Sequence, residues 1–184
     1  MTMDTSTTDE QLLRAFVKGD RASLGELADR YEKPLLGLAG GLLGTRTRAC
    51  DAVQEAWLRV IRHSASFNGS SRFKTWMYRI TINCCRDLQR KRVPRNSSDE
   101  QERNPKTPTP PEDDLIHRER NSELHEAIHA LDRTKRETIL LCYHDSMNHQ
   151  QAAAVLNIPL GTLKSRLNAA LNELRRTMRV EAIR

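Results

Sequence analysis

Apolar positions recur along almost the whole chain with the period of an α-helix. Large apolar residues return every three or four positions, and the strict alternation typical of strands is nearly absent. The spacing predicts an all-α protein. In its N-terminal half we expect a first helix capped by Asp9 and broken at Gly19–Asp20. Three further helices are expected over about 21–43, 47–63 and 72–92.

A proline-rich segment, 93–114, divides the chain. It holds five of the seven prolines together with many polar and charged residues. Such a segment cannot bury enough apolar surface to offset the entropy lost on ordering, so we interpret it as a flexible linker. The prediction is therefore two small helical domains, residues 9–92 and 115–184, joined by this linker.

The predicted helix over 72–92 has two chemically different faces. At 100° per residue, one face carries apolar residues and is expected to pack inward: Phe73, Trp76, Met77, Ile80, Cys84 and Leu88. A second, narrow row carries Arg72, Arg79, Arg86 and Arg90, with Asn83 beside them. A row of arginines without an interleaved acid is a natural track for phosphates. The alternative is an ordinary solvated cationic face.

Charge is sorted along the sequence. The net charge is +6, and the pI is about 9.4. Residues 4–32 contain seven acids and four bases, whereas 57–92 contain nine bases and one acid, Asp87. This asymmetry indicates that different surfaces meet different partners, and that one partner is a polyanion.

Two neighbouring segments add candidate contacts. The loop before the arginine helix contains Phe67, Asn68 and Gly69, which offer a ring and hydrogen-bonding groups to an unstacked base. The helix over 47–63 carries four residues at i, i+3, i+4 and i+7, namely Asp51, Gln54, Glu55 and Leu58. This acidic face beside an apolar anchor favours a protein partner, and a plain solvated face is the alternative.

The C-terminal part predicts a helix-turn-helix over 148–167. A helix over about 134–144 precedes Asn148, which can cap 149–156. A turn at Asn157–Pro159 then leads into a helix that starts near Gly161. Its outward first positions, Lys164, Ser165, Asn168 and Ala169, suit contacts to base edges in the major groove. A plain three-helix bundle is the alternative.

No catalytic, metal or cofactor site is predicted. His125 and His129 are four residues apart, but no third ligand follows at a suitable spacing. The four cysteines contain no CxxC pair and are interpreted as reduced thiols of a cytoplasmic protein. The sequence shows neither a secretory signal nor an apolar run of the roughly 20 residues that cross a bilayer, so we expect no membrane insertion.

With these residues in view, the chain resembles the bacterial sigma-70 factors of the extracytoplasmic function (ECF) type. The stretch Asp51–Val60 is similar to the region-2 pattern DxVQExxLRV, and Phe73–Arg92 is similar to FxxWLYRIAxN…D…RRR. The stretch Gly161–Leu167 resembles the region-4 signature GTVKSRL. The likeness extends over nearly everything except the first eight residues, the linker and the tail.

The resemblance implies a role for each segment. Asp51, Gln54, Glu55 and Leu58 would bind the clamp helices of the largest subunit of bacterial core RNA polymerase, and the polymerase flap would be a further contact. The −10 promoter element would meet Phe67, Asn68, Gly69, Arg79, Asn83, Arg86 and Arg90. The −35 element would meet Thr162, Lys164, Ser165, Arg166, Asn168 and Ala169. An anti-sigma factor is an expected partner, and holoenzyme would lie on the nucleoid.

Two other functions are also compatible with the sequence. A two-domain regulator would bind an operator through the helix-turn-helix without polymerase. A metal-dependent enzyme would use His125, His129 and nearby carboxylates, although the sequence offers no nucleophile–base pair for it. One departure from the resemblance also matters: Ala169 stands among positions that are often basic or aromatic, and its methyl group can contact only apolar atoms such as a thymine methyl.

Overall fold

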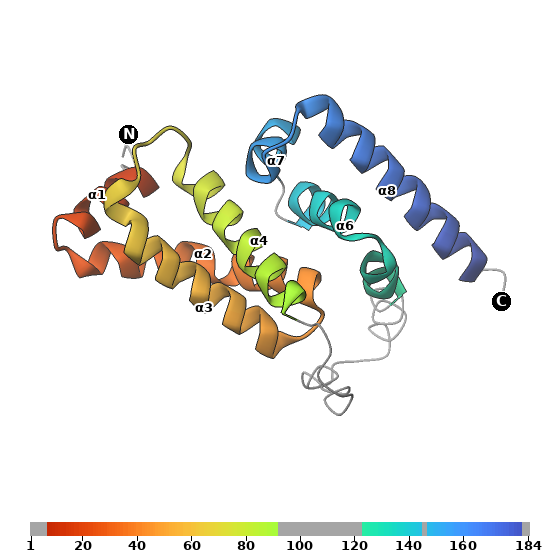
Figure 1. The fold of residues 1–184 in the computed structure, drawn as a ribbon, viewed down its shortest axis with the longest axis horizontal. Coiled ribbons are helices and arrows are strands. Elements are labelled where there is room, and N and C mark those ends of the chain that lie inside the picture. The colour runs from red at the N-terminus through yellow and green to blue at the C-terminus, as the bar shows by residue number, and fades with distance from the viewer. Residues whose placement is uncertain (1–6, 92–122, 145–146, 182–184) are drawn as a thin grey trace, which may run out of the picture.

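The computed structural model describes residues 7–91, 123–144 and 147–181. Every regular element within these ranges is helical, which confirms the all-α prediction. The N-terminal unit consists of α1 (Asp9–Val17), α2 (Arg21–Leu43), α3 (Arg46–His63), the 3-10 turn η1 (Ser64–Ser66) and α4 (Phe73–Arg90) (Figure 1). The predicted linker, 93–114, lies outside the described residues, as do the predicted domain limits at 92 and 115.

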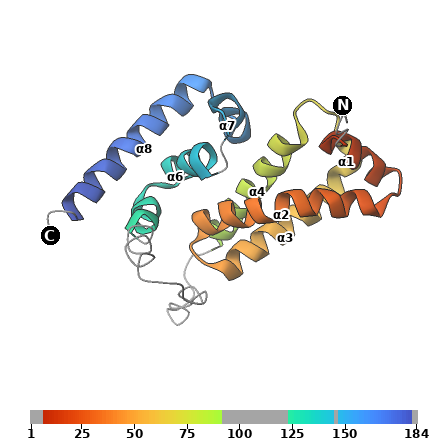
Figure 2. The same ribbon diagram turned by 180° about the vertical axis from the view of Figure 1, so that it is seen from behind.

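The C-terminal unit begins with a helical segment at 123–130 and continues through four labelled elements. These are α6 (Arg133–Ile139), the π-helical η2 (Leu140–His144), α7 (His149–Leu156) and α8 (Leu160–Glu181). The helix expected over 134–144 is therefore an α-helix that widens into a π-helix at Leu140. Both ribbon views show α6 between α4 and α8 (Figures 1 and 2).

The first helix is capped by Thr8, not by Asp9 as the sequence suggested. The Gln11 backbone N–H donates to the Thr8 hydroxyl (3.3 Å), and the Thr8 N–H donates to the Gln11 side chain (2.9 Å), forming a capping box. Asp9 is the first helical residue. Its carboxylate instead accepts hydrogen bonds from Arg30 (2.8 Å) and Tyr31 of α2.

Helix α4 is buried on more sides than one. The predicted apolar face is confirmed, with Phe73, Met77 and Cys84 buried, while Trp76, Ile80 and Leu88 are partly buried against the core. Other sides of the helix are buried as well, at Thr75, Tyr78, Thr81, Ile82 and Cys85. The reason is that α4 packs against α2, α3 and α7 together, so it forms the centre of the molecule.

The two units share one apolar core. A single cluster of buried side chains runs from the N-terminal helices into Leu140, Leu141, Met147 and the buried face of α7. A second, smaller cluster lies inside the C-terminal unit and includes Ile139, Leu167 and Leu174. The sequence pattern predicts two domains but does not predict that they pack against each other.

Candidate nucleic-acid interface

The arginine row on α4 lies where the two units meet. Arg79 donates from Nη2 to the Ala154 carbonyl of α7 (2.6 Å), and Arg86 donates to both carboxylate oxygens of Glu137 in α6 (2.8 and 2.6 Å). Asn83 is exposed and accepts a hydrogen bond from Arg86 (3.3 Å). The predicted residues are therefore brought together, but two of the arginines bind groups of the C-terminal unit.

The pair Arg86–Glu137 is a planar, two-point contact. A guanidinium presents parallel N–H groups that match a carboxylate or a phosphate, and such pairs are among the stronger hydrogen bonds in proteins. The Glu137 side chain is 2% exposed and that of Arg86 is 31% exposed. Hydrogen bonding to Glu137 raises the pKa of Arg86, so the guanidinium stays charged.

Arg79 is less well satisfied than Arg86. Its Nε is buried, and no acceptor among the described residues reaches it. A buried donor without a partner costs about 1–3 kcal/mol. The α7 carbonyl therefore satisfies only part of this guanidinium.

At the C-terminal end of α4, Arg90 belongs to a chain of ion pairs that reaches α3. Arg90 and Arg59 both bind the Asp87 carboxylate, Arg59 at 3.1 Å, and Arg59 also donates to Glu55 (2.8 Å). Hydrogen bonds from Arg90, and then from Arg59, hold the pKa of Asp87 below its ordinary value. The chain connects the acidic face of α3 with the arginine row.

The loop between η1 and α4 is shaped by its own side chains. Phe67 packs against Trp76 with ring centroids 5.0 Å apart, so one side of the ring is used in packing. The Asn68 side chain accepts from the Ser70 N–H (3.0 Å), and Gly69 has a left-handed φ of 73°. Asn68, Gly69 and Ser70 are exposed, as a segment open to a ligand has to be.

A cavity of about 660 Å³ opens beside this loop. The N-terminal unit contributes most of its wall, from the start of α1, from Arg30 and Tyr31 of α2, and from Gly69, Ser71, Arg72, Lys74 and Thr75. Met147 and Gln151 of the C-terminal unit complete it. Arginine and lysine side chains, the carboxylates of Asp9 and Glu10, hydroxyls and an aromatic ring thus surround a space at the N-terminal end of α4.

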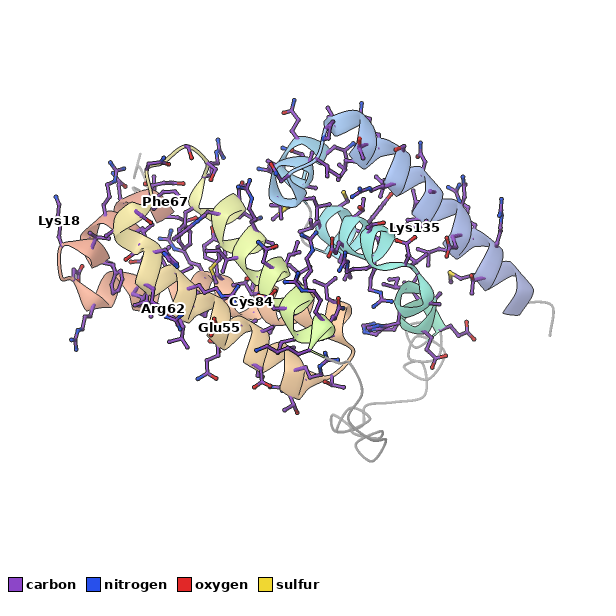
Figure 3. All side chains as sticks on the ribbon, in the orientation of Figure 1. Lys18, Glu55, Arg62, Phe67, Cys84 and Lys135 are labelled. Carbon is purple, nitrogen blue, oxygen red and sulfur yellow. The ribbon has the colours of Figure 1, made fainter. Side chains whose placement is uncertain are left out.

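The predicted polar face of α3 points away from the C-terminal unit. Asp51 and Gln54 are exposed, and Leu58 is 42% exposed although it is a large apolar residue. Figure 3 shows Glu55 and Arg62 on this outer side of the helix. Hydrogen bonding to Arg59 is the main cause that lowers the pKa of Glu55, which keeps the face acidic.

The helix-turn-helix has the predicted caps. Asn148 and Gln151 form a capping box at the start of α7, and Asn157 ends α7 with a left-handed φ of 54°. Helix α8 starts at Leu160, one residue before the predicted Gly161. Lys164, Ser165, Asn168 and Ala169 are all exposed, while Thr162 and Arg166 are half-buried.

Glu137, the acid that binds Arg86 of the arginine row, is not among the residues predicted from the sequence. A signal for it exists, because Glu137 shares the i, i+3, i+4 spacing with Leu140 and Leu141 and so places a carboxylate on an apolar stripe. A charged residue on such a stripe calls for an opposite charge across the interface. The partner could not be identified without knowing how the units pack.

The remaining candidates hold no metal site within the described ranges. The rings of His125 and His129 lie 5.4 Å apart, but no group of three or more potential ligands occurs in the described part of the chain. Burial raises the pKa of the Cys84 thiol to about 11 and that of Cys85 to about 12, which leaves both thiols protonated near neutral pH. None of the described helices has the length and apolar character needed to cross a membrane.

Comparison with known proteins identifies both units. A family model described as Sigma-70 region 2 matches residues 27–94, and one described as Sigma-70, region 4 matches residues 121–174. The ECF RNA polymerase sigma factor SigW of Bacillus subtilis (strain 168) is 30% identical over 172 residues, which cover 88% of this chain and 92% of SigW. The ECF RNA polymerase sigma-E factor of Escherichia coli (strain K12) is 29% identical over 175 residues, covering 90% and 91%.

Solved structures share the fold. The chain matches CnrH, solved in complex with the cytosolic domain of CnrY, with a TM-score of 0.73 and 23% identity over 94% of this chain and 97% of that one. It also matches the sigma factor RpoE, solved with the anti-sigma factor NepR from Bartonella quintana, with a TM-score of 0.64 and 22% identity over 85% and 97%.

These matches favour the sigma-factor interpretation over the operator-binding regulator and the metal-dependent enzyme. Both family models fall on the units that carry the arginine row and the helix-turn-helix. The chain therefore belongs to the ECF sigma factors of the sigma-70 family, the non-enzymatic specificity subunits that recognise promoters and direct transcription by RNA polymerase.

Proposed function

We propose that this protein uses three separate surfaces to bind RNA polymerase and to recognise the promoter. The outer face of α3 binds core RNA polymerase, the arginine row of α4 follows the −10 element, and the exposed start of α8 reads the −35 element. The observation that carries the proposal is the course of the arginine row. Arg79, Arg86 and Arg90 share one side of α4, and Arg72, at the N-cap position of the helix, lines the cavity at its N-terminal end.

The −10 element is proposed to run along α4 toward that cavity. Guanidinium groups bind backbone phosphates without regard to sequence, which fixes the register of the DNA. The cavity and the exposed residues Asn68 and Gly69 then receive one unstacked base of the melted strand. Phe67 would present only its ring edge or the face not packed on Trp76.

The −35 element is proposed to meet the first two turns of α8 in the major groove. Lys164, Ser165, Asn168 and Ala169 are exposed there, and the half-buried Thr162 and Arg166 lie at the edge of the same surface. A helix N-terminus also favours a phosphate, because its free N–H groups carry a partial positive charge. The polymerase flap is the proposed protein contact of this unit.

Core polymerase is proposed to bind through its clamp helices at Asp51, Gln54, Glu55 and Leu58. An exposed leucine on the same helix face as the exposed polar residues Asp51 and Gln54 has the make-up of an interface anchor. An anti-sigma factor is a further proposed partner, since the structurally similar RpoE is bound to NepR in its solved structure. We place this activity in the cytoplasm, on the nucleoid when holoenzyme is formed.

The −10 assignment is tested at Arg90, whose side chain is 73% exposed. Holoenzyme with Arg90→Gln should bind promoter DNA roughly 3- to 10-fold more weakly. The slope of the logarithm of its affinity against the logarithm of the salt concentration should fall by about 1. Lys33→Gln is the matched control, because it also removes one positive charge at an exposed position, on α2. If both variants bind promoter DNA equally well at every salt concentration, the arginine row has no part in DNA binding.

A further inference from the structure

The cavity that is proposed to receive a base is lined by groups of opposite hydrogen-bonding character. Asp9 and Glu10 of α1 contribute carboxylates, while Arg72 and Lys74 contribute cationic groups. An ionised carboxylate can only accept hydrogen bonds, whereas a guanidinium or an ammonium can only donate them. A base that enters the cavity therefore meets acceptors and donors that cannot exchange roles.

The two carboxylates differ in what they already bind. Both oxygens of Asp9 are occupied, because Arg30 donates to Oδ1 (2.8 Å) and the Tyr31 hydroxyl donates to Oδ2. Glu10 accepts from the Phe73 backbone N–H through Oε1 (2.8 Å), which uses one of the roughly four lone-pair sites of a carboxylate. Glu10 is therefore the carboxylate that keeps acceptor sites for a ligand.

The hydrogen bond to Phe73 also fixes where the Glu10 carboxylate lies. It holds the half-buried side chain at the first residue of α4, in the wall of a cavity that Gly69 of the proposed base-binding loop lines as well. A carboxylate that is already held loses little freedom when it binds a ligand. If a base brought another acceptor against it, the two lone pairs would repel and the buried oxygens would lack a partner.

Lys74 supplies a held donor to the same cavity. Its ammonium nitrogen lies 5.5 Å from the centroid of the Tyr78 ring, a cation–π contact that restrains the long side chain. An ammonium has three donors and can bind a ring nitrogen or a carbonyl oxygen of a base. The cavity thus suits a base that offers both a donor and an acceptor.

The four DNA bases differ in whether they can donate from an amino group. Cytosine, adenine and guanine each carry an exocyclic amine, whereas thymine carries carbonyl oxygens in the corresponding places. Acceptance of a hydrogen bond from the cytosine amine by a Glu or Asp side chain is a known pairing in protein–DNA recognition. A carboxylate in the cavity wall therefore favours an amine and disfavours thymine.

We propose that Glu10 is a specificity-determining residue of this cavity, which selects an unstacked base with an exocyclic amino group and rejects thymine. The inference rests on the proposed capture of one base beside the loop and names the class of base that is captured. Glu10 lies on α1, outside the loop and the arginine row that the sequence pattern singles out.

The test uses holoenzyme and single-stranded probes in which one central base stands in a run of abasic sites. Phosphate contacts are then the same in every probe, so differences in affinity come from the base. One matched pair carries 5-methylcytosine or thymine, which share the methyl group and differ in the amine. Further probes carry adenine or guanine, and one probe is abasic throughout.

Two variants separate the role of Glu10 from a general effect of charge. Glu10→Gln keeps an oxygen for the Phe73 N–H and gains an amide that can donate, so it accepts either member of the matched pair. Glu32→Gln removes one negative charge at an exposed position of α2 that does not line the cavity. Circular dichroism and urea unfolding verify that both variants are folded.

The unmodified chain and Glu32→Gln should bind the probes with an amino-bearing base at least about fivefold more tightly than the thymine probe. With Glu10→Gln the affinities for 5-methylcytosine and thymine should agree within about twofold. The proposal is overturned if the unmodified chain shows no preference within the matched pair, or if Glu10→Gln retains it.

Failure of the proposed base capture would look different. In that case no base-bearing probe would bind more tightly than the fully abasic probe, and the selection by Glu10 would fall with it. Tighter binding of all four bases without a preference for the amine would uphold base capture and reject only the role of Glu10.

Discussion

The Glu10 side chain caps a helix that begins 63 residues later in the sequence: its Oε1 accepts a hydrogen bond from the Phe73 backbone N–H at 2.8 Å. Helix α4 has no side-chain cap of its own, since Arg72 at its N-cap position makes no such bond. Helix α1 therefore satisfies one of the free N–H groups of α4 and attracts the positive end of that helix. This contact fixes the start of α4 beside the proposed base cavity.

Removing this cap should destabilise the N-terminal unit. Glu10→Ala should lower the free energy of unfolding by about 1 kcal/mol, in the range of other N-cap losses. Urea unfolding at neutral pH measures it. Glu10→Gln keeps an acceptor oxygen and should lose less. Equal stability of Glu10→Ala and the unmodified chain would show that the contact contributes nothing.

The stabilisation that Asp132 gives to the C-terminal unit should depend on pH. It caps α6 by accepting from the N–H groups of Thr134 (2.9 Å) and Lys135 (3.0 Å). Hydrogen bonds from the Lys135 side chain, then from Thr134, lower its pKa well below the ordinary 3.8. Because the folded pKa is depressed, the stabilisation is complete above pH 3.8 and is lost as the pH falls through the folded value.

Two substitutions separate capping from charge at this position. Asp132→Ala should lower the stability by about 1 kcal/mol at pH 7, and Asp132→Ser should lose less because serine also caps helices. Urea unfolding between pH 7 and pH 2 should show the advantage of aspartate over serine shrinking as the pH drops below 3.8. An advantage that is the same at both ends of this range contradicts the account.

Truncation of Leu58, on the proposed polymerase-binding face of α3, should weaken binding to core polymerase without destabilising the free protein. Leu58 is 42% exposed, so Leu58→Ala removes little buried surface from the free protein. The affinity for core polymerase should fall about 5- to 30-fold if Leu58 is an anchor of the interface. Val17→Ala on α1 is the control, because Val17 is similarly exposed at 46% on another surface. Equal affinities of the two variants would reject Leu58 as an anchor.

The proposed −35 surface predicts a change in salt dependence. Lys164→Gln should weaken binding to −35 duplexes of any sequence by a similar factor and lower the salt slope by about 1. Lys18→Gln removes the same charge at the far end of the N-terminal unit, as Figure 3 shows, and should leave the slope unchanged. Fluorescence anisotropy over a series of salt concentrations measures both. A slope that falls equally in both variants contradicts a local contact at Lys164.

The sequence predicts local structure well where one helix decides it. Helix α2 spans Arg21–Leu43 and α7 spans His149–Leu156, both as expected. Each begins after a residue whose side chain caps it and ends at a residue that adopts a left-handed conformation. The first cap was misassigned because Thr8 and Asp9 are both good N-cap residues. Only the structure shows that Arg30 and Tyr31 bind the Asp9 carboxylate.

The hydrophobic pattern of each helix does not predict how the two units pack against each other. Arg86 and Glu137 are 51 positions apart, and nothing in the spacing of either helix specifies the other. The same holds for Glu10 and Phe73, whose contact replaces a local cap. Sequence periodicity thus predicts the helix face of the proposed DNA-binding residues on α4 and α8, but it does not identify the groups that cover them.

The central claim is that this chain directs RNA polymerase to particular promoters through α3, α4 and α8. Reconstitution of the purified protein with bacterial core polymerase, followed by mapping of transcript starts across a bacterial genome, tests it most directly. The account predicts starts that share a −10 and a −35 motif about two helical turns apart, and that are used less often with Leu58→Ala or Arg90→Gln but equally often with Val17→Ala. Association with polymerase without any shared start motif, or no association at all, would contradict it.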